Sequence, residues 1–183
     1  MSFCVYVDDL LVRLSKIGVG CFIGRTFVGA LAYADDIVLV APSASALRKM
    51  LAVCDKYALE YCMPFNAQKS KCMALLPKSR RFLASQLDSC GSSIGSRPME
   101  FVNSYLHLGH LIYNKLEDDD DIARSQGQFI GQVNNVLTCF CKLDCFVRYL
   151  LFQSFGTSYY GCELWSLRSR KGTDFCHAWN NGV

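Results

Sequence analysis

Two apolar runs that meet at a pair of adjacent aspartates constrain the fold of this chain more than any other feature. In residues 30–34 alanine alternates with a leucine and a tyrosine, and residues 37–40 are β-branched or leucine throughout. A glycine precedes the first run and a proline follows the second. This pattern predicts a hairpin of two strands with Asp35 and Asp36 at its tip.

The two acids favour contact with a cation. Adjacent carboxylates repel each other and hydrate strongly, so a position between two nearly apolar strands is costly unless solvent or a cation meets them there. Mg²⁺ typically takes one or two protein carboxylates and completes its shell with water and substrate phosphates, which suits a nucleotidyl transfer site. Aspartate is also a common turn residue, and a polar hairpin turn without chemistry is the alternative.

The same segment resembles a family motif. Tyr33-Ala34-Asp35-Asp36 followed by an apolar strand is similar to the Tyr-x-Asp-Asp hairpin of reverse transcriptases, and its alanine resembles the version of non-LTR (LINE-type) retrotransposons. Later segments resemble this family in the expected order, so the resemblance covers most of the chain, from about residue 3 to 167. They are Phe65-Asn66-Ala67-Gln68-Lys69-Ser70-Lys71, Tyr105-Leu106-His107-Leu108-Gly109-His110, Phe129-Ile130-Gly131-Gln132-Val133-Asn134-Asn135-Val136 and Tyr160-Gly161-Cys162-Glu163-Leu164-Trp165.

The resemblance implies an RNA-directed DNA polymerase, or reverse transcriptase, that catalyses metal-dependent nucleotidyl transfer. In the intact family a DNA primer on an RNA template attacks the α-phosphate of a deoxynucleoside triphosphate, and two Mg²⁺ (or Mn²⁺) ions stabilise the attacking and leaving oxygens. Carried over by position, Asp35 is a metal ligand and Asp36 is the adjacent acid that supports it. Tyr33 is expected to face the same side as Asp35 and to line the primer or nucleotide site. The alternative for Tyr33 is a strand aromatic in the core.

Two lysines and a turn carry further implied contacts. Lys69 matches a lysine of the family's fourth palm motif, where a cation near the triphosphate neutralises charge or helps to protonate pyrophosphate. Lys71 is expected at a phosphate, and either lysine is alternatively an ordinary exposed strand residue. Leu108 and Gly109 match the primer-grip hairpin, where a backbone without a bulky side chain approaches the primer terminus closely.

Polar residues of a thumb-like helix are implied to follow the phosphate backbone of the nucleic acid, although polar helix faces are usually only solvated. His107 and His110 are expected to have surface or packing roles instead of metal-binding ones. The polar residues of the helix are Arg124, Gln128, Gln132 and Asn134.

A second Tyr-x-Asp-Asp sequence occupies residues 6–9. Charged residues and leucines at three- and four-residue spacing follow it, a pattern typical of a helix and not of a buried strand. The glycines at positions 18 and 20 predict the end of this helix. The catalytic assignment therefore falls on Asp35 and Asp36.

The remaining patterns predict further helices and strands. A helix capped by Ser43 or Ser45 is expected to run to about residue 61, and residues 69–76 resemble a strand. Residues 101–112 are expected to form paired strands that turn near Gly109. The acidic residues 117–121 favour a helix N-terminus, where carboxylates meet the positive end of the dipole, over a second metal site. The buried face of the first of these helices is predicted to comprise Leu47, Leu51, Cys54, Ala58 and Tyr61.

These elements indicate an α+β fold in three parts. Residues 1–115 resemble a partial polymerase palm, an antiparallel sheet with packed helices; residues 116–167 resemble a helical thumb; and residues 168–183 are predicted to be a polar tail. The family's other metal-binding aspartate and its fingers belong upstream of the segment with which this chain begins, so the chain is expected to be inactive alone. The alternative is a module derived from palm and thumb that binds nucleic acid or protein without catalysis.

The cysteine content does not indicate a disulfide scaffold. The chain has eleven cysteines, an odd number, and several lie in apolar periodic segments, which predicts buried free thiols. Residues 139–145 hold the densest group but lack a second pair at a usual zinc spacing. The cysteines in apolar segments include Cys4, Cys54, Cys72 and Cys139.

Charge and hydropathy limit the classes of partner only weakly. A formal charge of +3 is too small to argue for nucleic-acid binding by itself. No apolar run approaches the roughly 20 residues that a membrane helix needs, and no signal sequence is recognisable at the amino terminus. We therefore expect an intracellular protein, cytoplasmic or nuclear, without a membrane partner.

Overall fold

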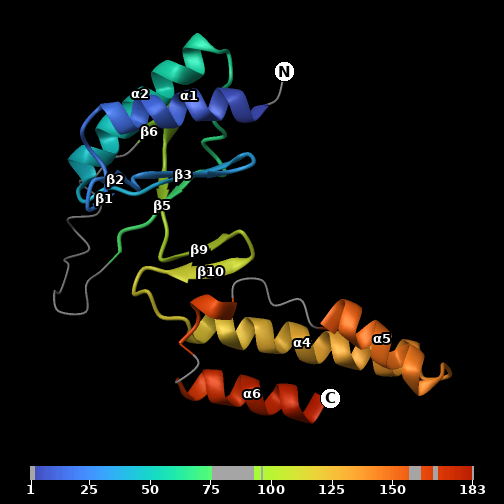
Figure 1. The fold of residues 1–183 in the computed structure, drawn as a ribbon. Helices are drawn as coiled ribbons and strands as arrows, with labels where there is room; N and C mark the ends of the chain where they lie inside the picture. Colours follow the sequence, from blue (N-terminus) through green and yellow to red (C-terminus); the bar gives the residue numbers. More distant parts are fainter. Residues whose placement is uncertain (1–2, 76–92, 96, 157–161, 167–168, 183) are drawn as a thin grey trace. The chain divides into compact units, whose positions relative to one another are not determined.

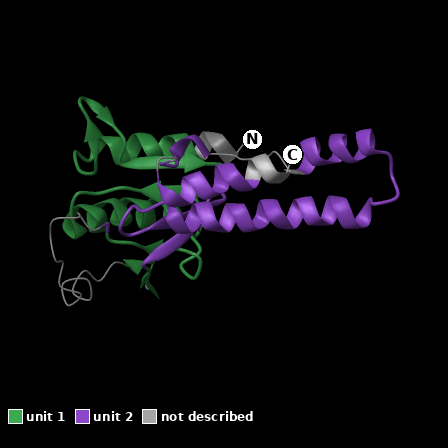
Figure 2. Ribbon diagram, turned by 90° about the horizontal axis from the view of Figure 1, so that it is seen from below, with its two compact units in different colours: residues 1–74, 80–102 green, residues 75–79, 103–183 purple. Residues whose placement is uncertain are grey.

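The computed structural model describes residues 3–75, 93–95, 97–156, 162–166 and 169–182. The chain divides into two compact units (Figure 2): unit 1 is Met1–Ala74 with Arg80–Val102, and unit 2 is Leu75–Ser79 with Asn103–Val183. Both contain helices and short strands, which confirms the α+β class (Figure 1). The described strands form separate two-stranded sheets, where a palm would have one larger antiparallel sheet. They are only two to four residues long, and each pairs along one edge.

Two helices, α1 (Phe3–Lys16) and α2 (Ala44–Glu60), form one side of unit 1 and pack against each other (Figure 1). As predicted, the first helix ends just before a glycine, Gly18, whose φ of 69° lies in the left-handed region. Leu10 and Leu14 of α1 are buried in the same cluster as three residues of α2. The buried residues of α2 are Ala46, Met50, Leu51, Cys54 and Tyr57.

The buried face of α2 differs in part from the expected one. Leu51 and Cys54 are buried as predicted, but Met50 and Tyr57 take the central positions, and Leu47, Ala58 and Tyr61 are only half-buried. The reason is that α2 meets two clusters at once. Met50, Cys54 and Tyr57 pack against α1, whereas Leu51 packs against a second cluster with Cys72, Ile94 and Met99.

Ser43 is the N-cap of α2. Its backbone is extended, with φ −154°, and its side-chain oxygen accepts a hydrogen bond from the Ala46 amide at 3.2 Å. We expect Ser43→Ala to lower the free energy of unfolding by about 1 kcal/mol, since it leaves a helix-terminal amide without its acceptor. Ser45→Ala is the matched control, because it makes the same substitution at the second residue of the helix. It should change the free energy of unfolding by less than about 0.5 kcal/mol. Urea unfolding compares the two; a larger loss in the Ser45 variant would contradict the cap assignment.

Two hairpins cover the other side of the helices. Strands β1 (Phe22–Ile23) and β2 (Thr26–Phe27) form the first, and β3 (Ala30–Tyr33) and β4 (Asp36–Leu39) form the second. Backbone hydrogen bonds join them, because Cys21 donates to Val40 at 3.2 Å and Val40 donates to Gly29 at 2.7 Å. A Cβ atom at Gly29 would lie 2.6 Å from the Phe27 ring, so this position requires glycine for the close approach.

The segment expected as a strand at 69–76 is shorter in the structure. Among the described residues 69–75, only β5 (Lys71–Cys72) is strand, and it pairs in parallel with β8 (Glu100–Phe101). Lys69 lies in a turn, because the Asn66 side chain accepts hydrogen bonds from the amides of Gln68 and Lys69. Strands β6 (Ser93–Ile94) and β7 (Arg97–Pro98) pair antiparallel just before β8.

Unit 2 joins a hairpin to three helices. Strands β9 (Ser104–His107) and β10 (His110–Tyr113) pair as predicted, and α4 (Asp119–Cys139) follows them. The acidic run begins α4, as expected, with Asp118 at its N-cap. Helices α5 (Cys145–Gly156) and α6 (Arg170–Gly182) both pack on α4, and a short 3-10 turn, η1 (Cys162–Leu164), lies between them in sequence.

The predicted polar tail at 168–183 is wrong for its described part, because residues 170–182 form α6. Phe175 of this helix is buried in one cluster with Ile122 and Trp165. Its ring lies 5.5 Å from that of Trp165 and 6.4 Å from that of Phe129, centroid to centroid. Phe175 thus anchors this helix on the apolar cluster of unit 2.

The cysteine predictions hold at two of the four positions. Cys54 and Cys72 are buried, and burial, with the nearby Asp55 charge, raises the pKa of the Cys54 thiol to about 12. Cys139 is exposed, contrary to expectation, because it lies on the outer side of the last turn of α4. The side chain of Cys4 lies outside the described part of the chain. None of the described helices combines the length and apolar character needed to cross a membrane.

Candidate functional site

The acidic hairpin forms at the predicted residues, but Asp36 is the first residue of β4 and only Asp35 lies in the turn. Tyr33 pairs with Asp36, so Ala34 and Asp35 form a two-residue turn at the tip. Ala34 has a φ of 49°, a left-handed conformation that costs a non-glycine residue about 1–2 kcal/mol. A tight two-residue hairpin turn requires a positive φ at this position.

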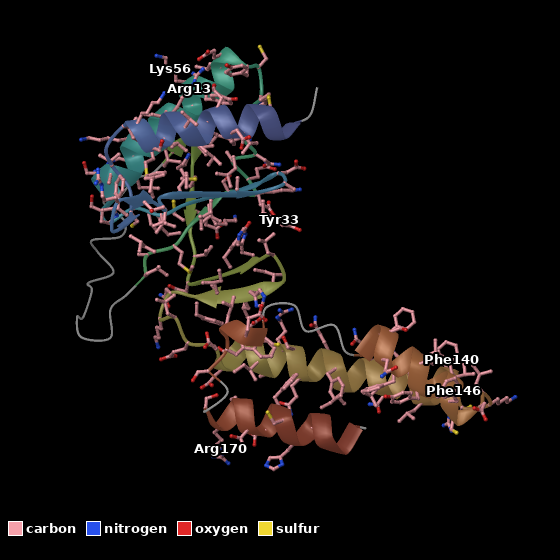
Figure 3. All side chains as sticks on the ribbon, viewed as in Figure 1. Arg13, Tyr33, Lys56, Phe140, Phe146 and Arg170 are labelled. Carbon is pink, nitrogen blue, oxygen red and sulfur yellow. The ribbon has the colours of Figure 1, made fainter. Side chains whose placement is uncertain are left out.

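The two faces of this hairpin differ sharply. Residues directly opposite each other share a face, so Ala30, Ile37 and Leu39 lie together and pack against the α1–α2 core. Tyr33 and Asp36 belong to the other face, with Leu31. Tyr33 is 63% exposed and projects away from the two helices (Figure 3). The core alternative for Tyr33 is therefore wrong.

The expectation that Tyr33 and Asp35 face the same side depends on strand alternation, and this alternation ends at the turn. Asp35 is a turn residue, and the acid that shares the face of Tyr33 is Asp36, its cross-strand partner. Any substrate that contacts the Tyr33 ring at this face therefore meets the Asp36 carboxylate beside it.

Both acids of the hairpin are exposed. Within the described residues, neither Asp35 nor Asp36 takes part in an ion pair or a side-chain hydrogen bond. Two adjacent carboxylates are a donor set that Mg²⁺ or Mn²⁺ accepts when water and phosphate oxygens complete the shell. No group of three or more histidine, cysteine or acidic side chains in the described ranges is arranged to hold a metal. The hairpin thus supplies at most part of a metal's ligands.

The two candidate lysines lie on another segment of unit 1. Lys69 is exposed in its turn, whereas the Lys71 ammonium lies 2.5 Å from Glu100 on the neighbouring strand. No ion pair or hydrogen bond of the described residues connects either lysine to Asp35 or Asp36. Lys71 is committed to a carboxylate of its own sheet, so Lys69 is the better placed of the two for a phosphate.

Leu108 and Gly109 form the two-residue turn between β9 and β10 in unit 2. Their φ angles of 47° and 86° are both positive, as a tight hairpin turn requires. A Cβ at Gly109 would meet nothing within 4 Å. Arg124 of α4 donates a hydrogen bond to the Gly109 carbonyl, which fixes the turn on the helix. The turn is therefore both open and rigidly held.

The second Tyr-x-Asp-Asp sequence lies on α1, as predicted, and serves packing. Asp9 forms an ion pair with Arg13 at 2.9 Å and accepts a hydrogen bond from the Tyr61 hydroxyl at 3.3 Å. Arg13 also binds Glu60 of α2 through two nitrogens, and this hydrogen bonding holds the pKa of Glu60 below its usual value. These contacts join α1 to α2.

A buried carboxylate that sequence reasoning missed is the centre of a hydrogen-bond network in unit 2. Asp121 is 3% exposed, and its carboxylate accepts hydrogen bonds from the Leu111 amide, the Arg124 guanidinium and the Trp165 indole, each at 2.9 Å. The His110 Nδ1 atom lies 3.2 Å away. Asp121 thus joins β10, α4 and the segment after η1. The only sequence signal was its place in an acidic run, which four other acids share.

This network corrects the expected role of one thumb residue. Arg124 is bound to Asp121 and to the Gly109 carbonyl, so it has a structural role and is not free to follow a phosphate backbone. Gln128, Gln132 and Asn134 are exposed on α4 and remain available. His110 has a packing role, as expected.

Comparison of the whole chain with protein-family models, with curated proteins and with solved structures gives no match.

Proposed function

We propose that this chain is a palm-and-thumb part of a reverse transcriptase of the non-LTR retrotransposon type, in which Asp35 and Asp36 bind a divalent metal ion for nucleotidyl transfer. The observation that carries the proposal is the contrast between two copies of one short motif. The copy at 33–36 closes a hairpin with both carboxylates exposed, and the copy at 6–9 is helical with Asp9 engaged in an ion pair and a hydrogen bond.

The chemistry follows from the charges at the hairpin tip. A metal ion bound there offsets negative charge on the attacking and leaving oxygens of a phosphoryl transfer. Asp35 and Asp36 hold the ion, and Tyr33 offers an exposed ring for a base or sugar beside Asp36. Lys69 supplies a mobile cation for a phosphate. The open Leu108–Gly109 turn accepts close approach of a primer backbone.

Metal binding at the hairpin is directly testable with Mn²⁺, which broadens the nuclear magnetic resonance signals of nearby amides. We expect broadening centred on residues 33–37, and we expect Asp35→Asn to weaken Mn²⁺ binding by about tenfold, since it removes one of two charged ligands. Asp8→Asn, in the helical copy of the motif, is the matched control and should leave binding unchanged. Equal losses in both variants, or broadening spread over all exposed acids, would contradict the proposal.

The catalytic part of the proposal needs a further aspartate, which the family places on an earlier palm strand. We expect the transcript upstream of the Met1 codon to continue in frame into such a strand. Primer extension on an RNA template by the extended protein should then depend on Mg²⁺ and be abolished by Asp35→Ala. Stop codons or unrelated sequence directly upstream would exclude polymerase activity for this product.

The polar face of α4 favours a second candidate, a nucleic-acid-binding module without catalysis. Gln128 and Gln132 are exposed there, and Cβ atoms at Gly127 and Gly131 would meet nothing within 4 Å, so a nucleic-acid backbone can approach this helix closely. RNA binding that survives both chelation of divalent metal and the Asp35→Asn change would favour this candidate.

A further inference from the structure

Unit 1 holds an open pocket of about 360 Å³ on the segment after α2. Residues 65–68 line one side, and Ile94, Gly95 and Arg97 of the β6–β7 hairpin line the other. Ile94 is buried and Phe65 is half-buried against the core, so the lining combines these two apolar side chains with polar ones. A lining of apolar side chains with a few polar groups is the usual composition of a small-molecule site.

Hydrogen bonds fix both walls of the pocket. On one side the Asn66 side chain accepts from the amides of Gln68 and Lys69, at 3.1 and 3.2 Å, and thereby sets the turn. On the other side the Gly95 amide donates to the Asp55 carboxylate of α2 at 2.7 Å. The pocket therefore exists before a ligand arrives, which lowers the entropic cost of binding.

The charge of the pocket favours an anion. Arg97 is exposed, and within the described chain its guanidinium forms no ion pair. Gln68, also exposed, adds an amide with two donors and an acceptor. A guanidinium recognises phosphate, an aromatic ring stacks on a nucleobase, and a side-chain amide reads the edge of a base.

A second open pocket of unit 1 has a different lining. It has a similar volume, about 300 Å³, and is lined by Ile17, Ala52 and Val53 with Arg13 and Lys56 at its rim (Figure 3). Arg13 is already bound to Asp9 and Glu60, and no amide side chain faces the pocket. Its lining lacks the combination of ring, amide and free guanidinium.

We propose that the pocket lined by residues 65–68 and by Ile94, Gly95 and Arg97 binds one unpaired nucleotide of a single-stranded RNA, with the base against Phe65, its edge at Gln68 and the phosphate at Arg97. The inference deepens the proposed function, on which it rests for the identity of the RNA. It assigns a contact for the single-stranded part of the substrate, remote in sequence from the acidic hairpin.

Titration of the full chain with adenosine monophosphate, followed by nuclear magnetic resonance, tests the pocket. We expect the amide signals of Gln68 and Gly95 to shift, and we expect adenosine without phosphate to bind about tenfold more weakly, since it lacks the charge-assisted contact to Arg97. Inorganic phosphate alone should bind weaker still. Phosphate that binds as tightly as the nucleotide, or shifts centred on other residues, would overturn the proposal.

Two variants that each remove one positive charge test where the anion binds. Arg97→Gln should weaken nucleotide binding by about tenfold, and Lys49→Gln, on the exposed side of α2, should leave it unchanged. Gln68→Ala, at an exposed turn position, gives a second variant with little risk to folding and should reduce discrimination between bases. Equal effects of the two charge changes would indicate a general electrostatic attraction and overturn the site.

An oligoadenylate distinguishes a residue of RNA from a free nucleotide. If the pocket serves RNA, the oligomer should bind at least tenfold more tightly than the mononucleotide and lose that gain in the Arg97→Gln variant; equal affinities would overturn the RNA assignment. The Asp35→Asn variant separates this inference from the proposed function. If the Asp35→Asn variant loses Mn²⁺ binding but keeps nucleotide binding, the change is confined to the metal site and the pocket proposal stands. If the unchanged chain binds Mn²⁺ at the hairpin but does not bind the nucleotide, the pocket proposal alone is overturned.

Discussion

Asp121→Ala is expected to lower the unfolding free energy of unit 2 by about 3–5 kcal/mol. The carboxylate is buried, and its removal leaves the Trp165 indole, the Leu111 amide and one nitrogen of Arg124 without their acceptor. Removing one member of a buried hydrogen-bonded charge network has a cost of this size because the remaining polar groups stay desolvated.

Urea unfolding followed by tryptophan fluorescence measures the effect, because Trp165 itself donates to Asp121. Asp120→Ala is the matched control. It removes the same charge from the same first turn of α4, but from an exposed position, so it should cost less than about 1 kcal/mol through the helix dipole alone. Similar losses in the two variants would show that only the dipole matters and would refute the network as a source of stability.

The same residue predicts a pH dependence. Burial on its own raises the pKa of Asp121, but hydrogen bonds from the Leu111 amide, Arg124, Trp165 and His110 outweigh it, so the pKa lies below the ordinary 3.8. A depressed pKa means that this stabilisation is complete above pH 3.8 and is lost as the pH falls through the lower folded-state value. The difference in stability between the wild type and Asp121→Asn should therefore shrink on acidification below pH 3.8, and a difference that grew there would contradict the sign.

Leu14→Ala is the second large effect, and it acts on unit 1. Leu14 is fully buried in the cluster that joins α1 to α2. We expect a loss of about 2–5 kcal/mol of unfolding free energy, which combines the lost transfer free energy with the cost of the cavity. The measurement is urea unfolding followed by far-ultraviolet circular dichroism, since α1 and α2 melt with their shared core.

Leu59→Ala provides the control for this change, because it is the same substitution in a helix at a residue that is 82% exposed. Its effect should stay within about 0.5 kcal/mol. If both leucine variants lost the same stability, the packing of α1 on α2 would not be the source of the effect.

Local patterns determined much of this protein. The alternation around Asp35 and Asp36 predicts the β3–β4 hairpin, the leucine spacing predicts α1, and the acidic run predicts the start of α4. The motif at 33–36 and its helical counterpart at 6–9 were also told apart correctly by the residues that follow each one. These features depend on side-chain periodicity, turn chemistry and the helix dipole, all of which act within a few residues of the chain.

Tertiary structure alone decided which polar residues became buried and which segments became anchored. Nothing in the acidic run separates Asp121 from its neighbours until Trp165, which follows 44 residues later in the chain, donates to its carboxylate. Likewise Phe175 of α6 is buried because Ile122 and Trp165 provide an apolar contact for its ring. Burial and pairing depend on residues that are distant in sequence, and a local pattern does not predict where those residues will lie.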